Sequence, residues 1–380
     1  MVAGSGHSSH VANGRPAGAR DTAIYEVTIS SVMPIMKVVS DSAHLLHDNS
    51  IEVEWGIPAG HWEAPVRAEV IEAELRRRSQ DFSFVTPTRH GRAPIDAVHD
   101  PGLVNFLARA WSDFQAMRRQ REVFPDTILH PALREGMGPA PVPHAIHAQL
   151  GYWCFETMTP LCEGTFAAAT AAVDVALTAT GLVLGGEQAA YGLCRPPGHH
   201  APRAAYGGYC YFNNAAISAQ MIASTTGSKV TVLDVDYHHG NGTQQIFYER
   251  PDVQYVSLHG DPNEAYPYLA GHADECGTGR GAGTTVNIPL PRRTDDESYI
   301  ASLGQALDAI DSFGPAIVVV SLGVDTFEHD PIGGFAVTTG AYGAHAAMVA
   351  ALGRPLVILQ EGGYHVPSLG LNVATWLRGV

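Results

Sequence analysis

The sequence predicts an α/β fold, with a mostly parallel multi-stranded sheet and helices on both of its faces. From Met36 onward, short apolar or β-branched runs alternate with longer amphipathic segments, which is the sequence pattern of repeated β-α-β units. Most of the short runs are continuously apolar, as expected of parallel strands that are buried on both faces. Polar residues gather where these runs end, and open α/β sheets place their chemistry at the carboxyl ends of strands.

Each expected element follows from its hydrophobic period. The expected strands are Lys37–Val39, Ala190–Cys194, Lys229–Asp234, Val253–Leu258, Thr285–Ile288, Ala316–Leu322 and Leu356–Gln360. The expected helices carry one polar stripe and one Ala- or Leu-rich stripe, and they are Ala64–Arg77, Gly102–Arg118, Glu163–Thr180, Asn213–Ser224, Asp296–Ser312 and Gly340–Ala351. Residues 119–143 show neither period, which predicts a long structured loop.

The domain organisation is expected to be simple. Residues 1–35 are rich in Gly, Ser, Ala and His and lack the apolar run of a secretory signal, so we expect a disordered extension, with Met36 a second plausible start. Residues 36–380 are expected to form a single domain with a loop insertion near residues 119–160.

Composition and charge limit the class of protein. No apolar run approaches the roughly 18 to 20 residues that a membrane span needs. The net charge of −15 argues against nucleic acid as a partner and suits a cationic ligand. The five cysteines show no paired framework, which predicts free, mostly buried thiols in a reducing cytoplasm; they are Cys154, Cys162, Cys194, Cys210 and Cys276.

Three side chains at two strand ends could bind one metal ion. In VTVLDVDYHHGNG, Asp236 and His238 lie two residues apart, so in extended backbone they point to the same side. Asp325 follows another strand, and an Asp–His–Asp set leaves an open coordination position, as in catalytic zinc sites. The alternatives are a polar turn for the Asp-x-His pair and a helix cap for Asp325.

Two further segments carry groups that suit proton transfer. RPPGHHA presents His199 and His200 after a strand, and EGGY presents Tyr364 on a double-glycine turn. Imidazoles titrate near neutral pH, and a phenol hydroxyl can donate a hydrogen bond. Taken separately, a solvated histidine pair and a structural tyrosine would be the ordinary interpretations.

Together these segments resemble a known family. RPPGHHA, GGYCYFNNAA, LDVDYHHGNGTQ, SLHGDP and LQEGGY, in this order and spacing, resemble the zinc-dependent histone deacetylase superfamily over roughly Met36 to the C-terminus. GYWC, SLHGDPNEAYPYLAG, SLGVDTFEHDPI and GLNVATWLRG are most similar to the bacterial acetylpolyamine amidohydrolases. The resemblance implies the arginase–deacetylase fold and a zinc-dependent amidohydrolase that releases acetate from small N-acetylated amines, such as acetylpolyamines or acetylated diamines.

The resemblance also implies roles for the residues at the strand ends. Asp236, His238 and Asp325 would hold one zinc ion per chain, with ferrous iron as the open alternative. His200 would act as general base and then as general acid, and Tyr364 would donate to the oxyanion of the tetrahedral intermediate.

Partners of the histidines are implied in the same way. His199 would be oriented by Asp234, and His200 by Asn241. Because a carboxylate favours the imidazolium and an amide does not, the two histidines should differ in basicity.

Further residues would bind the substrate or structural ions. The substrate-binding residues implied are Tyr209 and Tyr266, which would line a narrow tunnel, with Gly208 and Trp153. A structural potassium ion would be bound by the side chains of Asp234 and Ser257 and the carbonyls of Asp236, His238 and Leu258, and a second near Phe247, Arg250 and Val253.

Departures from the family pattern bear on the substrate. Trp153 occupies the place where peptide-binding histone deacetylases carry an acid, which disfavours histone-like substrates. Where polyamine deacetylases have two acids, this chain has His147 and Met158, with Glu156 close by. The long loop builds a dimer in the family, so residues 119–160 are the expected interface of a homodimer.

Three alternatives remain. The first is an acetyl-lysine protein deacetylase of the same superfamily. A ureohydrolase of the arginase fold would need two manganese ions and more acids around them than this chain offers. A catalytically silent acetyl-amine binding protein is disfavoured because His199, His200 and Tyr364 are all present.

Overall fold

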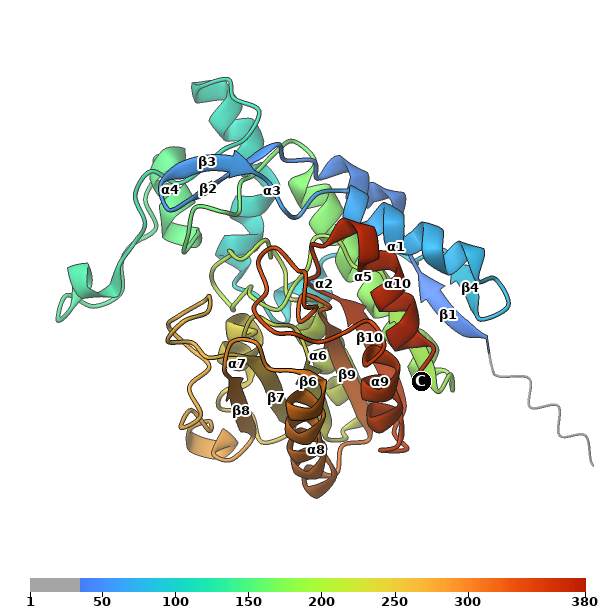
Figure 1. Ribbon diagram of the computed structural model, residues 1–380. Helices are drawn as coiled ribbons and strands as arrows, with labels where there is room; N and C mark the ends of the chain where they lie inside the picture. Colours follow the sequence, from blue (N-terminus) through green and yellow to red (C-terminus); the bar gives the residue numbers. More distant parts are fainter. Residues whose placement is uncertain (1–34) are drawn as a thin grey trace, which may run out of the picture. The chain divides into compact units, whose positions relative to one another are not determined.

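An eight-stranded parallel sheet lies at the centre of the structure, a computed structural model that describes residues 35–380 (Figure 1). Its strands are β1 (Met36–Val39), β4 (Phe82–Val85), β5 (Ala189–Gly192), β6 (Val230–Asp234), β7 (Val253–Gly260), β8 (Thr285–Leu290), β9 (Ile317–Leu322) and β10 (Leu356–Gln360). They lie side by side in the order β4-β1-β5-β10-β9-β6-β7-β8, and each neighbouring pair is parallel. All seven strands expected from the sequence are present, whereas the extension expected over residues 1–35 lies, except for Ile35, outside the described residues.

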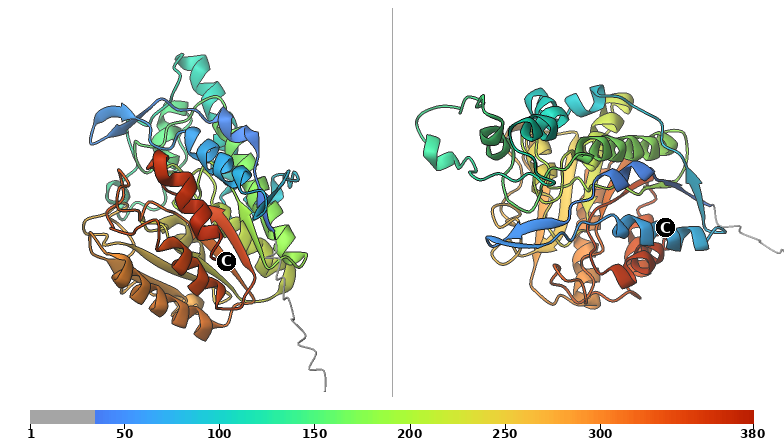
Figure 2. Two further views of the ribbon diagram at one scale, coloured as in Figure 1. Left: turned by 45° about the vertical axis from the view of Figure 1, so that its right-hand side comes forward. Right: turned by 90° about the horizontal axis from the view of Figure 1, so that it is seen from above.

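Helices cover both faces of the sheet (Figure 2). They are α1 (Val66–Arg77), α2 (Ala93–Asp96), α3 (Pro101–Met117), α4 (Ile146–Trp153), α5 (Thr165–Leu184), α6 (Asn214–Thr226), α7 (Asn241–Phe247), α8 (Asp296–Phe313), α9 (Tyr342–Ala350) and α10 (Val366–Leu377). Successive strand residues alternate between two cores: Val39 packs with α3, α5 and α6, and Val38 packs with α1, α8, α9 and α10. Strands buried on both sides explain their continuous apolar runs.

Local signals in the sequence fix the ends of the best-predicted helices. The carboxylate of Asp295 accepts a hydrogen bond from the backbone N–H of Ser298 at the start of α8, and Gly314 ends that helix with φ +70°. Asp100 caps α3 directly before Pro101, which suits the first turn because it lacks an N–H that would need a partner.

The sequence pattern did not reveal the short strands near the N-terminal side. The edge strand β4 has only four residues, and β2 (Ile51–Glu54) pairs with β3 (Ile57–Gly60) as a separate antiparallel hairpin. The hairpin turn is Trp55–Gly56, with φ values of +49° and +79°. Such turns usually carry Asn-Gly, whereas tryptophan rarely adopts a left-handed backbone. The sequence therefore lacks the usual signal of this hairpin.

The long loop predicted at residues 119–143 is present. It contains one turn of 3-10 helix, Pro131–Arg134, and it is followed by α4, which lies inside the wider insertion expected near 119–160. The bridge between Val123 and Leu161 closes this segment at its base.

The prediction that no apolar run approaches the length of a membrane span needs correction. Among the described residues, α5 is a 20-residue helix that contains an 18-residue window with a mean hydropathy of 1.7, long and apolar enough by composition to cross a membrane. However, 72% of this window is buried inside the structure, because α5 packs against the central strands of the sheet. The prediction for the cysteines is confirmed: all five are free, and only Cys276 is exposed.

The topology brings the predicted polar segments together. Strands β5, β10, β9, β6 and β7 are consecutive neighbours, and each is one of the strands whose carboxyl end or following loop carries such a segment. The parallel direction places all these ends at one edge of the sheet, which is where the site must form.

Candidate active site

The three predicted metal ligands converge after β6 and β9. Their ligand atoms lie within 4.8 Å of one another, and all three side chains of Asp236, His238 and Asp325 are buried. His238 Nδ1 lies 2.9 Å from Asp325 Oδ2 and 3.3 Å from Asp236 Oδ1. Two carboxylates and one imidazole in this arrangement form a ligand set for a divalent cation.

The chemistry of this donor set fits a cation. Burial, and then the neighbouring Asp236 carboxylate, raise the pKa of Asp325 to about 8, so a positive charge would relieve the repulsion between the two acids. The backbone also approaches closely: Gly362 N donates to Asp236 Oδ2 at 2.7 Å, and a Cβ on Gly362 would lie 2.3 Å from Asp325 Oδ2. Glycine is therefore required where the EGGY segment passes the carboxylates.

The two predicted histidines lie beside the predicted metal ligands. The rings of His199 and His200 have centroids 4.0 Å apart. His199 Nδ1 contacts Asp234 Oδ2 at 3.0 Å, and His200 Nδ1 contacts Asn241 Oδ1 at 2.7 Å. Each histidine thus has the partner that the sequence predicts.

Their environments separate the two histidines electrostatically. For His199, burial opposes the charged form, but the charges of Asp234 and Asp236 outweigh it and raise its pKa well above the usual value. For His200, burial and then the neighbouring His199 and His238 hold the pKa well below the usual value. The expected difference in basicity is present, and His200 is the neutral member of the pair.

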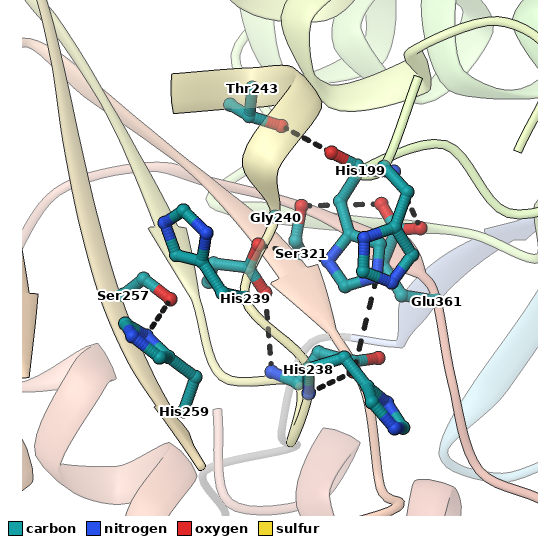
Figure 3. Close-up of polar contacts among 12 residues, drawn as sticks. His199, His238, His239, Gly240, Thr243, Ser257, His259, Ser321 and Glu361 are labelled. Atoms are coloured by element: carbon teal, nitrogen blue, oxygen red, sulfur yellow. Dashed lines mark hydrogen bonds and ion pairs between the residues drawn. The ribbon is translucent and has the colours of Figure 1, made fainter. Parts of the chain in front are cut away.

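Glu361 braces this group of side chains, although the sequence prediction gave it no role (Figure 3). Its Oε2 accepts hydrogen bonds from the backbone N–H groups of Gly198 at 2.7 Å and His199 at 3.2 Å, and its Oε1 accepts from the Ser321 hydroxyl. It therefore connects the strand ends of β10 and β9 with the RPPGHHA loop. In the sequence, only its position directly before Gly362, Gly363 and Tyr364 points to such a role.

Tyr364 is held by groups from distant parts of the chain. Arg67, from α1, donates from Nε to the Gly363 carbonyl at 2.7 Å and from Nη2 to the Glu361 carbonyl at 2.6 Å. Its guanidinium also lies 4.5 Å from the centre of the Tyr364 ring, and Asp330 accepts from the Tyr364 N–H at 2.7 Å. Neither Arg67 nor Asp330 was predicted, since a lone arginine in a helix gives no motif.

Two predicted aromatic residues flank the histidine and tyrosine groups. The Tyr209 ring is 5.9 Å from the Tyr364 ring, and the Tyr266 ring is 5.0 Å from the His200 ring. Gly208 precedes Tyr209 with φ +59°, and a Cβ there would meet His200 at 2.4 Å. The wall beside His200 therefore needs glycine at this position.

Two acids support this wall from behind. The Tyr209 hydroxyl donates to Glu52 Oε2 at 3.0 Å, and the Gly208 N–H donates to Glu156 Oε1 at 3.1 Å. Burial raises the pKa of Glu52 to about 7, although its hydrogen bonds from Tyr209 and Trp62 oppose this. Glu52 lies on the β2–β3 hairpin, which the hydrophobic pattern did not reveal, so it was missed.

Trp153 does not join these side chains. It is 4% exposed in the core, stacked on Phe106 and edge-on to Tyr152, because α4 turns it toward α3. Its predicted contact with substrate has no support in these contacts. His147, at the start of α4, is exposed.

The residues predicted to bind potassium lie on neighbouring strands behind the site. Asp234 on β6 pairs in register with Ser257 on β7, one residue before Leu258. Within residues 35–380, no hydrogen-bond donor reaches the carbonyl oxygens of Asp236 and His238. Buried carbonyls without a hydrogen bond, in the segment that follows Asp234, suit a cation that prefers oxygen ligands. The residues named for a second ion, Phe247, Arg250 and Val253, lie between the end of α7 and the start of β7.

Comparison with known proteins agrees with this geometry. A model of the histone deacetylase domain matches residues 61–380. The chain is 44% identical over 345 residues to acetylpolyamine amidohydrolase from Mycoplana ramosa, covering 91% of this chain and 99% of that protein. It is 39% identical over 346 residues to acetylpolyamine amidohydrolase 1 from Pseudomonas aeruginosa, covering 91% and 98%.

A solved structure extends the likeness to the fold. The crystal structure of acetylpolyamine aminohydrolase from Burkholderia pseudomallei superposes with a TM-score of 0.85 at 38% identity, covering 90% of this chain and 98% of that one. The predicted arginase–deacetylase fold is confirmed. The chain belongs to the histone deacetylase family, and over 91% of its length it resembles members named acetylpolyamine amidohydrolases.

Proposed function

We propose that this protein is a zinc-dependent deacetylase that releases acetate from small N-acetylated amines, with acetylpolyamines and acetylated diamines as its substrates. The observation that carries the proposal is the buried Asp236–His238–Asp325 set with His199 and His200 beside it. The family match and the names of the relatives support the same reaction class.

Asp236, His238 and Asp325 would hold the metal ion. When bound, a zinc ion supplies a Lewis acid for the amide carbonyl and lowers the pKa of water to near neutrality. Asp234, Ser257 and the carbonyls beside them would hold a structural potassium ion.

The chain's own residues supply the proton transfers. His200, neutral and oriented by Asn241, takes a proton from the attacking water and later delivers it to the departing amine. His199, charged and paired with Asp234, steadies the negative charge that develops beside it. Tyr364 donates its hydroxyl proton in a hydrogen bond to the oxyanion of the tetrahedral intermediate.

A cationic amine suits the charge around the site. Glu52 and Glu156 hydrogen-bond with Tyr209 and Gly208, and we propose that they take the role of the acids missing at His147 and Met158. The net charge of −15 adds a long-range attraction for a polyamine. A histone tail is also cationic, so direct comparison of substrates must decide between the two.

A panel of substrates tests the proposal. Acetate release should be measured from acetylputrescine, acetylcadaverine, acetylspermidine and an acetyl-lysine peptide, using protein with one zinc ion per chain. We expect kcat/KM to be higher for the small amines than for the peptide. Higher kcat/KM for the peptide would favour the protein deacetylase, and no acetate from any of them would favour a silent binding protein.

Tyr364→Phe removes only the hydroxyl proposed to donate to the oxyanion. We expect kcat to fall by about 10²–10³, with KM and zinc content nearly unchanged, because one oxyanion donor contributes this much in comparable sites. The matched control is Tyr299→Phe, which removes the hydroxyl of another buried tyrosine. Undiminished kcat in the Tyr364 variant would contradict the oxyanion role.

Glu52→Gln keeps a hydrogen-bond acceptor for Tyr209 and removes the negative charge. We expect KM for acetylated diamines to rise about threefold to tenfold, because a screened charge pair contributes on the order of 1 kcal/mol. The effect should grow as pH rises through 7, since the carboxyl ionises above its pKa of about 7. A neutral N-acetylalkylamine is the control, and an equal rise in its KM would exclude a charge effect.

We also propose that the protein is a cytoplasmic homodimer with residues 119–160 at the interface. Leu133 and Met137 in this segment are 69% and 64% exposed, which suits contact with a second copy. Sedimentation should give twice the mass of the chain, and Leu133→Glu with Met137→Glu should give the monomer.

A further inference from the structure

The SLHGDP segment supplies a buried histidine that the proposed reaction does not use. His259 is fully buried at the end of β7, and its two ring nitrogens each contact one oxygen. Nδ1 lies 2.8 Å from the Ser257 hydroxyl, as Figure 3 shows, and Nε2 lies 2.8 Å from the Gly271 carbonyl oxygen. Its ring therefore links a strand residue to a residue twelve positions later in a loop.

Hydrogen-bonding chemistry assigns the protons of this link. No carboxylate within residues 35–380 forms a hydrogen bond or an ion pair with the His259 ring, so its two contacts with a hydroxyl and a carbonyl indicate which nitrogen carries the proton. A carbonyl only accepts, so Nε2 must carry the proton and Nδ1 must be the acceptor. The Ser257 hydroxyl then donates to Nδ1. Both of its oxygen lone pairs remain available for another partner.

Those lone pairs belong to the oxygen cluster, the group of oxygen atoms proposed above to bind potassium. Ser257 stands in register with Asp234, and the carbonyls of Asp236 and His238, two and four residues further along that segment, receive no hydrogen bond within residues 35–380. If the hydroxyl proton pointed toward this cluster, it would repel a cation. His259 prevents this by accepting the hydrogen bond from the hydroxyl.

The other end of the link is the loop that carries Tyr266. Gly271 has φ +105°, and a Cβ on it would lie 2.7 Å from His259 Nε2, so the loop rests directly on the imidazole. Between Gly260 at the end of β7 and Gly271, this loop places the Tyr266 ring 5.0 Å from the His200 ring. His259 thus fastens the far end of the segment that forms one wall of the site.

We propose that His259 is a positioning residue that aims Ser257 at a monovalent cation and docks the Tyr266 loop onto the same site, so that cation binding orders residues 261–271. The inference rests on the potassium ion of the proposed function. It adds a connection between that ion and the substrate-facing wall.

Two substitutions of His259 each keep one of its two hydrogen bonds and remove the other. His259→Asn places an amide oxygen near the Nδ1 position, where it can accept from Ser257, but it is too short to reach Gly271. His259→Gln reaches toward the Nε2 position and can donate to Gly271, but it offers Ser257 no acceptor. His345→Phe, at another buried histidine, controls for general loss of stability.

The test uses the zinc-loaded protein without substrate, in potassium chloride exchanged for choline chloride at constant ionic strength. In the wild type, we expect Tm to rise with potassium and amide exchange in residues 261–271 to slow. The potassium midpoint should increase about tenfold in His259→Gln and stay near the wild-type value in His259→Asn and His345→Phe. In His259→Asn, potassium should no longer slow exchange in the loop.

Three results would overturn the inference. An unchanged potassium midpoint in His259→Gln would show that the imidazole does not orient Ser257. Loop exchange that ignores potassium in the wild type would remove the connection to Tyr266, a result that needs no variant to fold. A wild-type Tm without any response to potassium would refute the cation assignment itself. Acetate release, measured separately, would report on the deacetylase proposal independently of all three.

Discussion

Removing the metal ion with a chelator is expected to abolish acetate release completely. The proposed ligands Asp236, His238 and Asp325 are buried around one position. None of the roles proposed for His199, His200 and Tyr364 supplies the double positive charge of a divalent cation. Dialysis against a chelator, followed by metal analysis and an acetate assay, measures the loss. Addition of one equivalent of zinc should restore the activity, and the same experiment with ferrous iron compares the two metals.

Substitution of one proposed zinc ligand provides the matched experiment. Asp325→Ala should bind zinc much more weakly and show no acetate release, whereas Asp330→Asn, which alters a neighbouring carboxylate outside the ligand set, should retain stoichiometric zinc. Full activity in protein shown to be free of metal would refute the metal-dependent mechanism.

His200→Ala is expected to lower kcat by about 10²–10⁴, the usual contribution of a positioned general base and acid. The reason is geometric as well as electrostatic: burial holds the pKa of His200 well below its usual value, Asn241 Oδ1 lies 2.7 Å from its Nδ1, and its ring neighbours that of His238, a proposed zinc ligand. Steady-state kinetics with acetylputrescine over a range of pH measure the effect. The limb of the pH profile that reports the base should disappear in the variant.

Two comparisons make that result specific. His345→Ala removes a buried imidazole elsewhere and should leave kcat near the wild-type value. His199→Ala should also lower kcat, but the pH limb assigned to His200 should remain. If His199→Ala removed this limb and His200→Ala did not, the roles of the two histidines would be reversed.

The sequence predicted the strand ends well because their chemistry and their hydrophobic pattern coincide. The β6 run ends in Asp234, and the next alternating residues, Asp236 and His238, point to one place, so a local rule of extended backbone was sufficient. The contacts of His199 with Asp234 and of His200 with Asn241 followed from the family resemblance, and the structure contains both.

The sequence could not predict contacts between residues that lie far apart along the chain. Arg67 contacts the Glu361–Gly363 turn from almost 300 positions away, and Glu52 reaches Tyr209 across 157 positions. Neither spacing leaves a periodic signal. Trp153 shows the opposite error, because a residue aligned with a substrate-binding position can be turned into the core by the helix that carries it.

The contact between Arg67 and the Tyr364 turn has a consequence for how the chain can be divided. Every residue proposed to bind zinc or transfer protons lies after residue 198, so the second half alone contains the full set of reactive groups. Yet the turn that presents Tyr364 is fastened by a side chain from α1, which itself packs along α10. A C-terminal fragment would therefore contain the reactive groups without the means to hold them, and reconstitution would require the N-terminal fragment to be supplied as a separate polypeptide.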